Sequence, residues 1–151
     1  MKIVIGNDRQ GLLLKRELVI WLRDNGYEVI DVGTDSDAPC DYPIFAESVA
    51  SLVSNGICSR GIVICATGIG MSIAANKLAG IRCGLAYDDE VTKLMRQHND
   101  ANVIAFGQRF MSLEDVKRRL DIFLHTDFLG GHHQKRIDLI TQIEEKQRSI
   151  K

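Results

Sequence analysis

The sequence has few prolines and lacks any long apolar run. Its two prolines fall in loops or at helix starts, and no proline-rich linker, low-complexity tract or short-period repeat divides the 151 residues. No stretch of about 18 consecutive apolar residues occurs, and the apolar run at the N-terminus is too short for a secretory signal. We therefore expect one soluble domain over residues 1–151, a cytoplasmic location and no contact with a membrane.

The sequence also lacks an excess of charge of either sign. Its 19 basic and 20 acidic residues leave no overall field that would attract nucleic acid, so we expect no nucleic-acid partner. Any anion must therefore be bound locally. Neither the dinucleotide motif GxGxxG nor the phosphate loop GxxxxGK[ST] matches the glycine-bearing turn near residue 68, which argues against nucleotide binding.

Motifs for disulfides and metals are absent as well. The four cysteines show no CxxC spacing, and without an export signal this favours free thiols over disulfides or a zinc site. His132 and His133 are adjacent, so their side chains point in different directions, and no third ligand follows at a suitable spacing. We expect neither a metal nor a cofactor.

Apolar periodicity predicts alternating strands and helices. We expect strands over residues 2–8, 27–34, 60–67, 81–88 and 102–108. Helices are expected over residues 12–26, 41–56, 70–80, 90–99 and 113–128, with a C-terminal helix from about residue 134. Strands that are apolar throughout are typical of a parallel sheet with helices on both faces. The predicted fold class is therefore α/β, a single doubly wound (Rossmann-like) sheet of five parallel strands.

Polar side chains follow the ends of the predicted strands. In an open parallel sheet, ligands bind beyond the carboxyl ends of the strands, where the connections reverse direction. The residues at these ends are Asn7, Asp8, Arg9, Cys65, Thr67, Tyr87, Asp88, Gln108 and Arg109. We therefore expect one crevice of dense polar chemistry at this edge of the sheet.

The stretch "CATGIGMS", residues 65–72, is a glycine-bearing turn that leads into a helix. Such a turn presents free backbone N–H groups and the positive end of a helix dipole to an anion; the other interpretation is a tight turn that needs glycine for its dihedral angles. A helix N-terminus also stabilises a thiolate, so Cys65 is a candidate nucleophile or general base. The alternative is a small apolar core residue, the role that we expect for Cys83.

Two further segments carry titratable groups. "RQHNDAN" places His98 and Asn99 at the end of a helix, where a histidine serves as an acid or base near neutral pH or caps the helix at the surface. "GGHHQKR" places His132, His133 and Arg136 at the start of the last helix. This segment either binds a phosphate through its cations and helix-terminal N–H groups or forms a solvated basic turn.

These motifs, in this order, carry a resemblance. The stretches "GND", "DVGT", "DYP", "ICATGIGMSIAANK", "GIR", "RQHNDANVIAFGQR" and "GGHHQKR" run over essentially the whole chain. Together they resemble the type B ribose 5-phosphate isomerase family, which also includes galactose 6-phosphate and allose 6-phosphate isomerases. The most specific parts are the cysteine and glycine turn and the segment from "RQHN" to "FGQR".

The resemblance implies an aldose–ketose isomerase that acts on a phosphorylated sugar, most simply ribose 5-phosphate and ribulose 5-phosphate. It implies that Cys65 is the base that moves a proton between C1 and C2, with Thr67 beside it. The backbone N–H groups of residues 66–70, which are Ala66, Thr67, Gly68, Ile69 and Gly70, then hold the oxygen of the enediolate intermediate.

The resemblance also implies roles for residues outside this turn. His98, with Asn99 beside it, opens the furanose ring, and Asp8 binds the sugar hydroxyls. Arg109 and Arg136 bind the phosphate. Members of the family are dimers or larger, so the resemblance implies a homodimer or homotetramer whose sites are assembled across two chains.

The chain departs from the family pattern at three positions. The family usually has histidine after the first-strand aspartate and arginine after the late glycine pair, whereas this chain has Arg9 and His132. We expect Arg9 to supply the phosphate charge that is lost at His132. Ala66 replaces the usual glycine, which is tolerable only at a negative φ.

The departures leave other functions open. The same chemistry on a hexose or tetrose phosphate is one alternative, motivated by Arg9 and His132. A sugar-phosphate-binding subunit without catalysis is another, but a pure binder has no need of the base that Cys65 provides. A thiol redox protein fits least, because no resolving cysteine lies nearby in the sequence.

Overall fold

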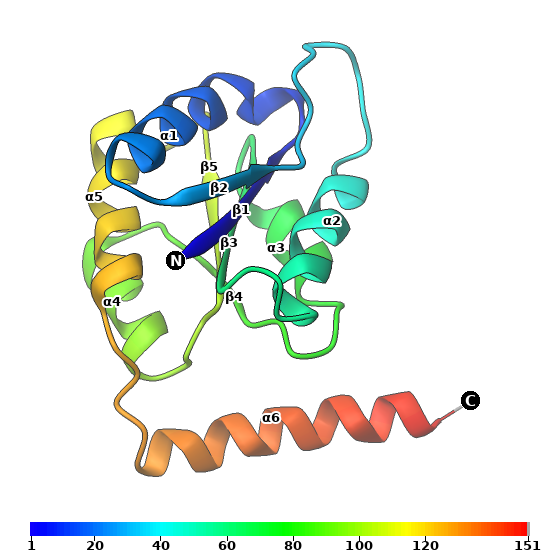
Figure 1. Cartoon of the computed structure of the whole chain (residues 1–151). Coiled ribbons are helices and arrows are strands. Elements are labelled where there is room, and N and C mark those ends of the chain that lie inside the picture. The colour runs from blue at the N-terminus through cyan, green and yellow to red at the C-terminus, as the bar shows by residue number, and fades with distance from the viewer. Residues whose placement is uncertain (151) are drawn as a thin grey trace.

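The computed structural model describes residues 1–150, and a parallel sheet of five strands runs through its centre (Figure 1). The strands are β1 (Lys2–Asn7), β2 (Glu28–Asp31), β3 (Arg60–Cys65), β4 (Cys83–Leu85) and β5 (Val103–Gly107). Their order across the sheet is β2-β1-β3-β5-β4, and every neighbouring pair is parallel. The predicted α/β class and the five parallel strands are confirmed.

Helices connect the strands. They are α1 (Leu12–Asp24), α2 (Tyr42–Ser54), α3 (Ile69–Ala75), α4 (Asp89–Gln97), α5 (Leu113–His125) and α6 (His132–Ser149), with a short 3-10 helix η1 (Arg9–Gly11) before α1. Side-chain oxygens fix two of the helix starts. Asp88 accepts a hydrogen bond from the N–H of Val91, and Ser112 accepts one from the N–H of Asp115, so each satisfies a backbone donor in the first turn.

Helices cover both faces of the sheet (Figure 1), and each face has its own apolar core. Ile62 and Ile64 of β3 pack with residues of α1, α4 and α5 on one face. Val63 and Cys65 of the same strand pack with residues of α2 and α3 on the other. Because both faces are covered, the strand is apolar at every position, and Cys65 belongs to the face that α2 and α3 cover.

A topological switch point lies between β1 and β3, because the connections that follow β1 and lead to β3 run in opposite directions across the sheet. From β1 the chain crosses through α1 to β2 on one side, and from β2 it crosses through α2 to β3 on the other side. Asp8 and Ala66 directly follow these two strands, and the N–H of Asp8 donates to the carbonyl of Ile64 at 3.2 Å. This is the kind of crevice in which ligands bind to open parallel sheets.

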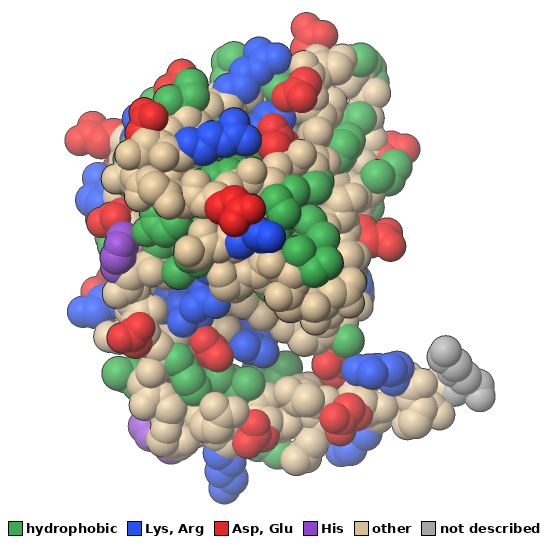
Figure 2. Space-filling model, viewed as in Figure 1, with side chains coloured by type: hydrophobic (Ala, Val, Ile, Leu, Met, Phe, Trp, Pro, Cys, Tyr) green, Lys and Arg blue, Asp and Glu red, His purple; other side chains and the backbone are tan. Residues whose placement is uncertain are grey.

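Helix α6 lies apart, at the edge of the sheet where the strands begin (Figure 1). It starts at His132 rather than at about residue 134, because Gly130 and Gly131 take positive φ values of 68° and 59° and end the preceding turn there. Glu144 accepts a hydrogen bond from the N–H of Gly80 at 2.9 Å. A hollow of about 730 Å³ remains between α6 and the sheet layers, visible in Figure 2.

Helix α3 is shorter than the sequence pattern predicts. It ends at Ala75 instead of near residue 80. The cause is Asn76, whose side chain bonds to both backbone groups of Cys83, accepting from its N–H at 2.7 Å and donating to its carbonyl at 3.0 Å. Among residues 1–150, no helix combines the length and apolar character needed to cross a membrane.

Candidate active site

The turn after β3 holds the thiol of Cys65 against a backbone donor. Cys65 is the last residue of β3 and its side chain is 6 % exposed. Gly68 adopts a φ of 82°, in the left-handed region that favours glycine, and this conformation aims its N–H at Sγ of Cys65, 3.1 Å away. The local chain path therefore holds the sulfur of Cys65 against a backbone donor at the end of β3.

The other residues of this turn are held by a hydrogen bond and by close packing against β5. The hydroxyl oxygen of Thr67 accepts a hydrogen bond from the N–H of Ile69 at 3.1 Å, which leaves its own proton free to donate. Gly107, at the end of β5, approaches so closely that a Cβ there would lie 2.5 Å from the carbonyl carbon of Thr67. Ala66 has a negative φ, since Asp100 is the single non-glycine residue with positive φ among residues 1–150. Alanine is thus tolerated at position 66.

Asp8 borders this turn from β1. Its Oδ1 accepts the N–H of Gln10 at 2.9 Å, which starts η1. Burial raises the pKa of Asp8 above its ordinary value, while backbone hydrogen bonds from Gln10 and Gly11 and the charge of Arg9 oppose the rise. The carboxylate is therefore partly dehydrated, as is typical of a group that binds a ligand. The side chain of Arg9 is exposed on η1.

Arg109 borders the turn from β5. Its N–H donates to the carbonyl of Ala66 at 3.1 Å, and the N–H of Gln108 donates to the carbonyl of Cys65 at 2.9 Å. The side chain of Gln108 accepts the N–H of Leu14 at 2.8 Å and so ties the start of α1 to the same loop. Asp8, Cys65 and Arg109 thus lie on three neighbouring strand ends, as the sequence predicts.

Sequence reasoning selected Tyr87 at this edge but not Tyr42 or Phe110. The ring of Tyr42, the first residue of α2, lies so close to Gly70 that a Cβ on Gly70 would be 2.8 Å from it. A pocket of about 360 Å³ beside Thr67 is lined by the largely exposed rings of Tyr87 and Phe110, among others. The motif "DYP" contains Tyr42, but only the contact with Gly70 identifies it as a neighbour of the turn.

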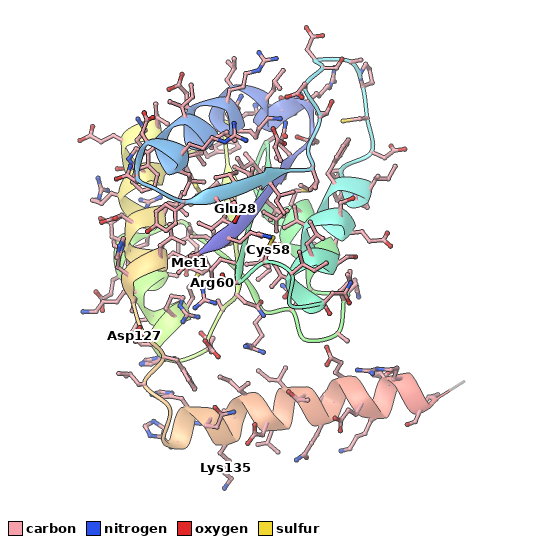
Figure 3. The ribbon with its side chains drawn as sticks, viewed as in Figure 1. Met1, Glu28, Cys58, Arg60, Asp127 and Lys135 are labelled. Atoms are coloured by element: carbon pink, nitrogen blue, oxygen red, sulfur yellow. The ribbon has the colours of Figure 1, made fainter. Side chains whose placement is uncertain are left out.

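The histidines form a second group at the opposite edge. His98 ends α4, and its ring stacks on that of His133 with centroids 4.2 Å apart and planes 12° apart. The ring of His132 lies 4.0 Å from His133 at 38°. With Asn99 and Arg136 these residues line a pocket of about 570 Å³. Figure 3 shows that the side chain of Lys135 points away from the sheet, outside this group.

The two groups do not meet within one chain. Strand β3 runs from Arg60 to Cys65, a span of about 17 Å at the usual rise per residue. Cys65 is at its carboxyl end, whereas His98 precedes β5, at the amino end where the N–H of Gly61 donates to the carbonyl of Asn102. Figure 3 shows Arg60 on the same side of the sheet as Asp127, where the chain enters α6. The sheet therefore separates the histidines from the thiol.

No candidate metal centre emerges from residues 1–150, which contain no cluster of three or more His, Cys, Asp or Glu side chains arranged to hold an ion. All four cysteines are free thiols.

Comparisons with known proteins show the family of this chain. A family model described as Ribose/Galactose Isomerase matches residues 3–140. Ribose-5-phosphate isomerase B of Escherichia coli (strain K12) is 48 % identical over 96 % of this chain and 97 % of its own length. The chain belongs to the ribose/galactose isomerase family. The resemblance inferred from the motifs is thus confirmed.

Solved structures agree with this family assignment. The ribose-5-phosphate isomerase B of Clostridium thermocellum has a TM-score of 0.96 and 46 % identity, covering 97 % of this chain and 99 % of the other. The enzyme of Mycoplasma genitalium, solved with bound ribulose-5-phosphate, has a TM-score of 0.91 and 39 % identity, covering 95 % and 96 %. The chain therefore has the full fold of the ribose/galactose isomerase family, including its sheet and α6.

Proposed function

We propose that this protein interconverts ribose 5-phosphate and ribulose 5-phosphate by moving a proton between C1 and C2 of the open-chain sugar. The observation that carries the proposal is the hydrogen bond from the N–H of Gly68 to Sγ of Cys65, which places the sulfur of the proposed base inside a turn of backbone donors. The substrate follows the relatives, which are named for this reaction at up to 48 % identity.

The reaction needs a base on one face of the sugar and donors at the oxygen where charge develops. The thiolate of Cys65 takes the proton from C2 of the aldose, the electron pair forms the C1–C2 double bond, and O1 gains the negative charge. The proton returns from sulfur to C1 while O2 passes its own proton to O1, and the ketose results. No atom is added or lost.

The turn divides its donors between the base and the oxyanion. The N–H of Gly68 serves the sulfur and that of Ile69 serves the hydroxyl of Thr67. The N–H groups of Ala66 and Gly70 and the proton of the Thr67 hydroxyl then stabilise the enediolate oxygen. The partly buried carboxylate of Asp8 accepts hydrogen bonds from the sugar hydroxyls.

A second chain completes the site in this proposal. His98 opens the sugar ring and Asn99 binds its oxygens, but both lie at the edge of the sheet opposite the thiol. A homodimer, or a homotetramer built from dimers, brings the histidine edge of one chain to the thiol edge of another. Exposed apolar side chains on α3 and α6 support such an association; they are Ile69, Ile73, Leu139, Ile140 and Ile143.

The phosphate is bound by cations from both edges. Arg109, and Arg9 in place of the usual histidine, come from the thiol edge, and both side chains are exposed there. Arg136 and His132 come from the second chain, at the start of α6, where backbone N–H groups add to the positive field. Bidentate guanidinium contacts suit a phosphate monoester.

A panel of phosphorylated sugars tests the proposal. We expect kcat/KM for ribose 5-phosphate to exceed that for the 6-phosphates of allose and galactose and for erythrose 4-phosphate by about tenfold or more, because one carbon changes the distance between phosphate and C1. A higher kcat/KM for a hexose or tetrose phosphate would assign that sugar instead. Binding of sugar phosphates without any isomerisation would identify a non-catalytic subunit.

A further inference from the structure

The three imidazoles at the start of α6 are arranged as a stack. The ring of His133 contacts both others, lying nearly parallel to His98 at 4.2 Å and tilted against His132 at 4.0 Å. His133 is 9 % exposed, whereas His98 and His132 are more open to solvent. The buried ring is thus the support on which His98 lies.

Backbone hydrogen bonds fix the two segments that carry the parallel rings of His98 and His133. The N–H of His133 donates to the carbonyl of Gly130 at 3.1 Å, and Ile137, one turn further along α6, is also buried. The N–H of Leu129 donates to the carbonyl of Gln97, the residue before His98, at 3.1 Å. The segment that carries His133 is therefore tied directly to the end of α4.

Electrostatics favour a neutral ring at His133. Burial lowers the pKa of His133, and the charges of His132, His98 and Arg136 act in the same direction. After α4, the carboxylate of Asp100 is bonded to Arg96 at 2.8 Å and to Arg82 at 3.4 Å. On α6, Asp138 accepts a hydrogen bond from Gln134. The groups that face His133 therefore leave it a flat, uncharged surface.

We propose that His133 is a positioning residue for His98, whose ring it holds in the orientation needed for opening the sugar ring. The inference rests on the ring-opening role proposed above for His98. In that step O1 loses its proton, the C1–O4 bond breaks with its electron pair passing to O4, O4 takes a proton, and C1–O1 becomes a carbonyl. Both proton transfers need the imidazole at a fixed angle to the sugar, and an unsupported ring at a helix end rotates freely.

Anomer exchange of ribose 5-phosphate measures this step without isomerisation. In a Cys65→Ala background the C1–C2 proton transfer is removed, while His98 still opens and closes the ring. The exchange between α and β anomers is followed by NMR magnetisation transfer, with the uncatalysed rate subtracted. We expect adding His133→Ala to slow the enzyme-dependent exchange by about tenfold to a hundredfold, since misplacement of a catalytic group by about 1 Å has effects of that size.

Two further variants separate positioning from folding. His133→Phe keeps a flat ring in the stack, so exchange should stay within about threefold of the Cys65→Ala parent. Ile137→Ala removes apolar packing one turn further along α6 while keeping all three rings, and it should leave the exchange rate similar to that of the parent. Equal losses in His133→Ala, His133→Phe and Ile137→Ala would overturn the proposal, as would full exchange in His133→Ala.

The same variants also test the ring-opening role of His98 separately from the positioning role of His133. If Cys65→Ala does not accelerate anomer exchange, or if adding His98→Asn leaves the acceleration intact, the ring-opening role of His98 fails and the positioning role of His133 fails with it. The isomerase activity of the unmodified protein is measured separately, so neither outcome decides the proposed function. If His98→Asn abolishes the exchange and His133→Ala does not change it, the positioning role alone is wrong.

Discussion

At the scale of single residues, the backbone around each thiol distinguishes Cys65 from Cys83. Cys65 is the last residue of β3 and Cys83 is the first residue of β4, and both contact the apolar core beneath α2 and α3. Burial raises the pKa of the Cys83 thiol to about 12, so it stays protonated. Sγ of Cys65 instead receives the N–H of Gly68. The same residue type thus meets a backbone donor at the end of β3 and desolvating surroundings at the start of β4.

The kinetics of two cysteine variants test this difference. Cys65→Ala should lower kcat by about 10²–10⁴-fold with KM little changed, because it removes a general base and spares the groups that bind the sugar. Cys83→Ala is the matched control and should change only the free energy of unfolding, since its small buried thiol packs in the core. Near-normal turnover by Cys65→Ala, measured by steady-state kinetics, would exclude the thiolate base.

Residue types and their order in the chain were sufficient to predict the thiol edge of the site. Asp8, Cys65 and Arg109 follow apolar strands, and parallel strands end at one edge, so their proximity follows from the fold class. The contact of Tyr42 with Gly70 and the stacking of His98 on His133 have no such signal. Each joins residues from separate elements, and the packing angle of those elements is not encoded in a local pattern.

At the scale of elements, periodicity located every strand and helix, but not all of their ends or the strand order. The start of α6 at His132 and the end of α3 at Ala75 depend on glycine conformation and on the bonds of Asn76 to Cys83. Strand β5 inserts between β3 and β4, although β4 precedes it in the chain. That order results from how the crossover helices pack, which the apolar pattern of a strand does not specify.

The docking of α6 should depend on pH through His133. Because burial lowers the pKa of His133 in the folded protein, the unfolded chain binds a proton at a pH where the folded chain does not. The contribution of this residue to the free energy of unfolding is therefore complete above the ordinary pKa of 6.5 and is lost as the pH falls below it. The difference in urea midpoint between the unmodified protein and His133→Phe should change between pH 7.5 and about pH 5.5.

The comparison with His133→Phe isolates this one group, because all other titrating residues are shared by the two proteins. We expect the unmodified protein to lose stability relative to His133→Phe on acidification, as its buried imidazole is charged only at a cost. A stability difference that stays constant over this pH range would show that His133 titrates normally and that its burial has no electrostatic consequence.

At the scale of the whole molecule, the sheet divides the chemistry into two halves. Cys65, the turn that follows it and Asp8 lie at the carboxyl ends of the strands. His98, His132, His133 and Arg136 lie at the amino ends beside α6. The sequence could not reveal this division from spacing alone. It follows once α4 is placed as the crossover from β4 to β5, because the C-terminus of a crossover helix lies at the amino edge of a parallel sheet.

If one working site needs two chains, two inactive variants with changes at opposite edges should complement each other. Cys65→Ala and His98→Asn are each purified, mixed in equal amounts, unfolded and refolded together. Half of the dimers then pair one variant with the other, and each such dimer has one site with both native residues. We expect recovery of about a quarter of the unmodified activity for a symmetric dimer. Activity no higher than the average of the two variants refolded separately would contradict a shared site.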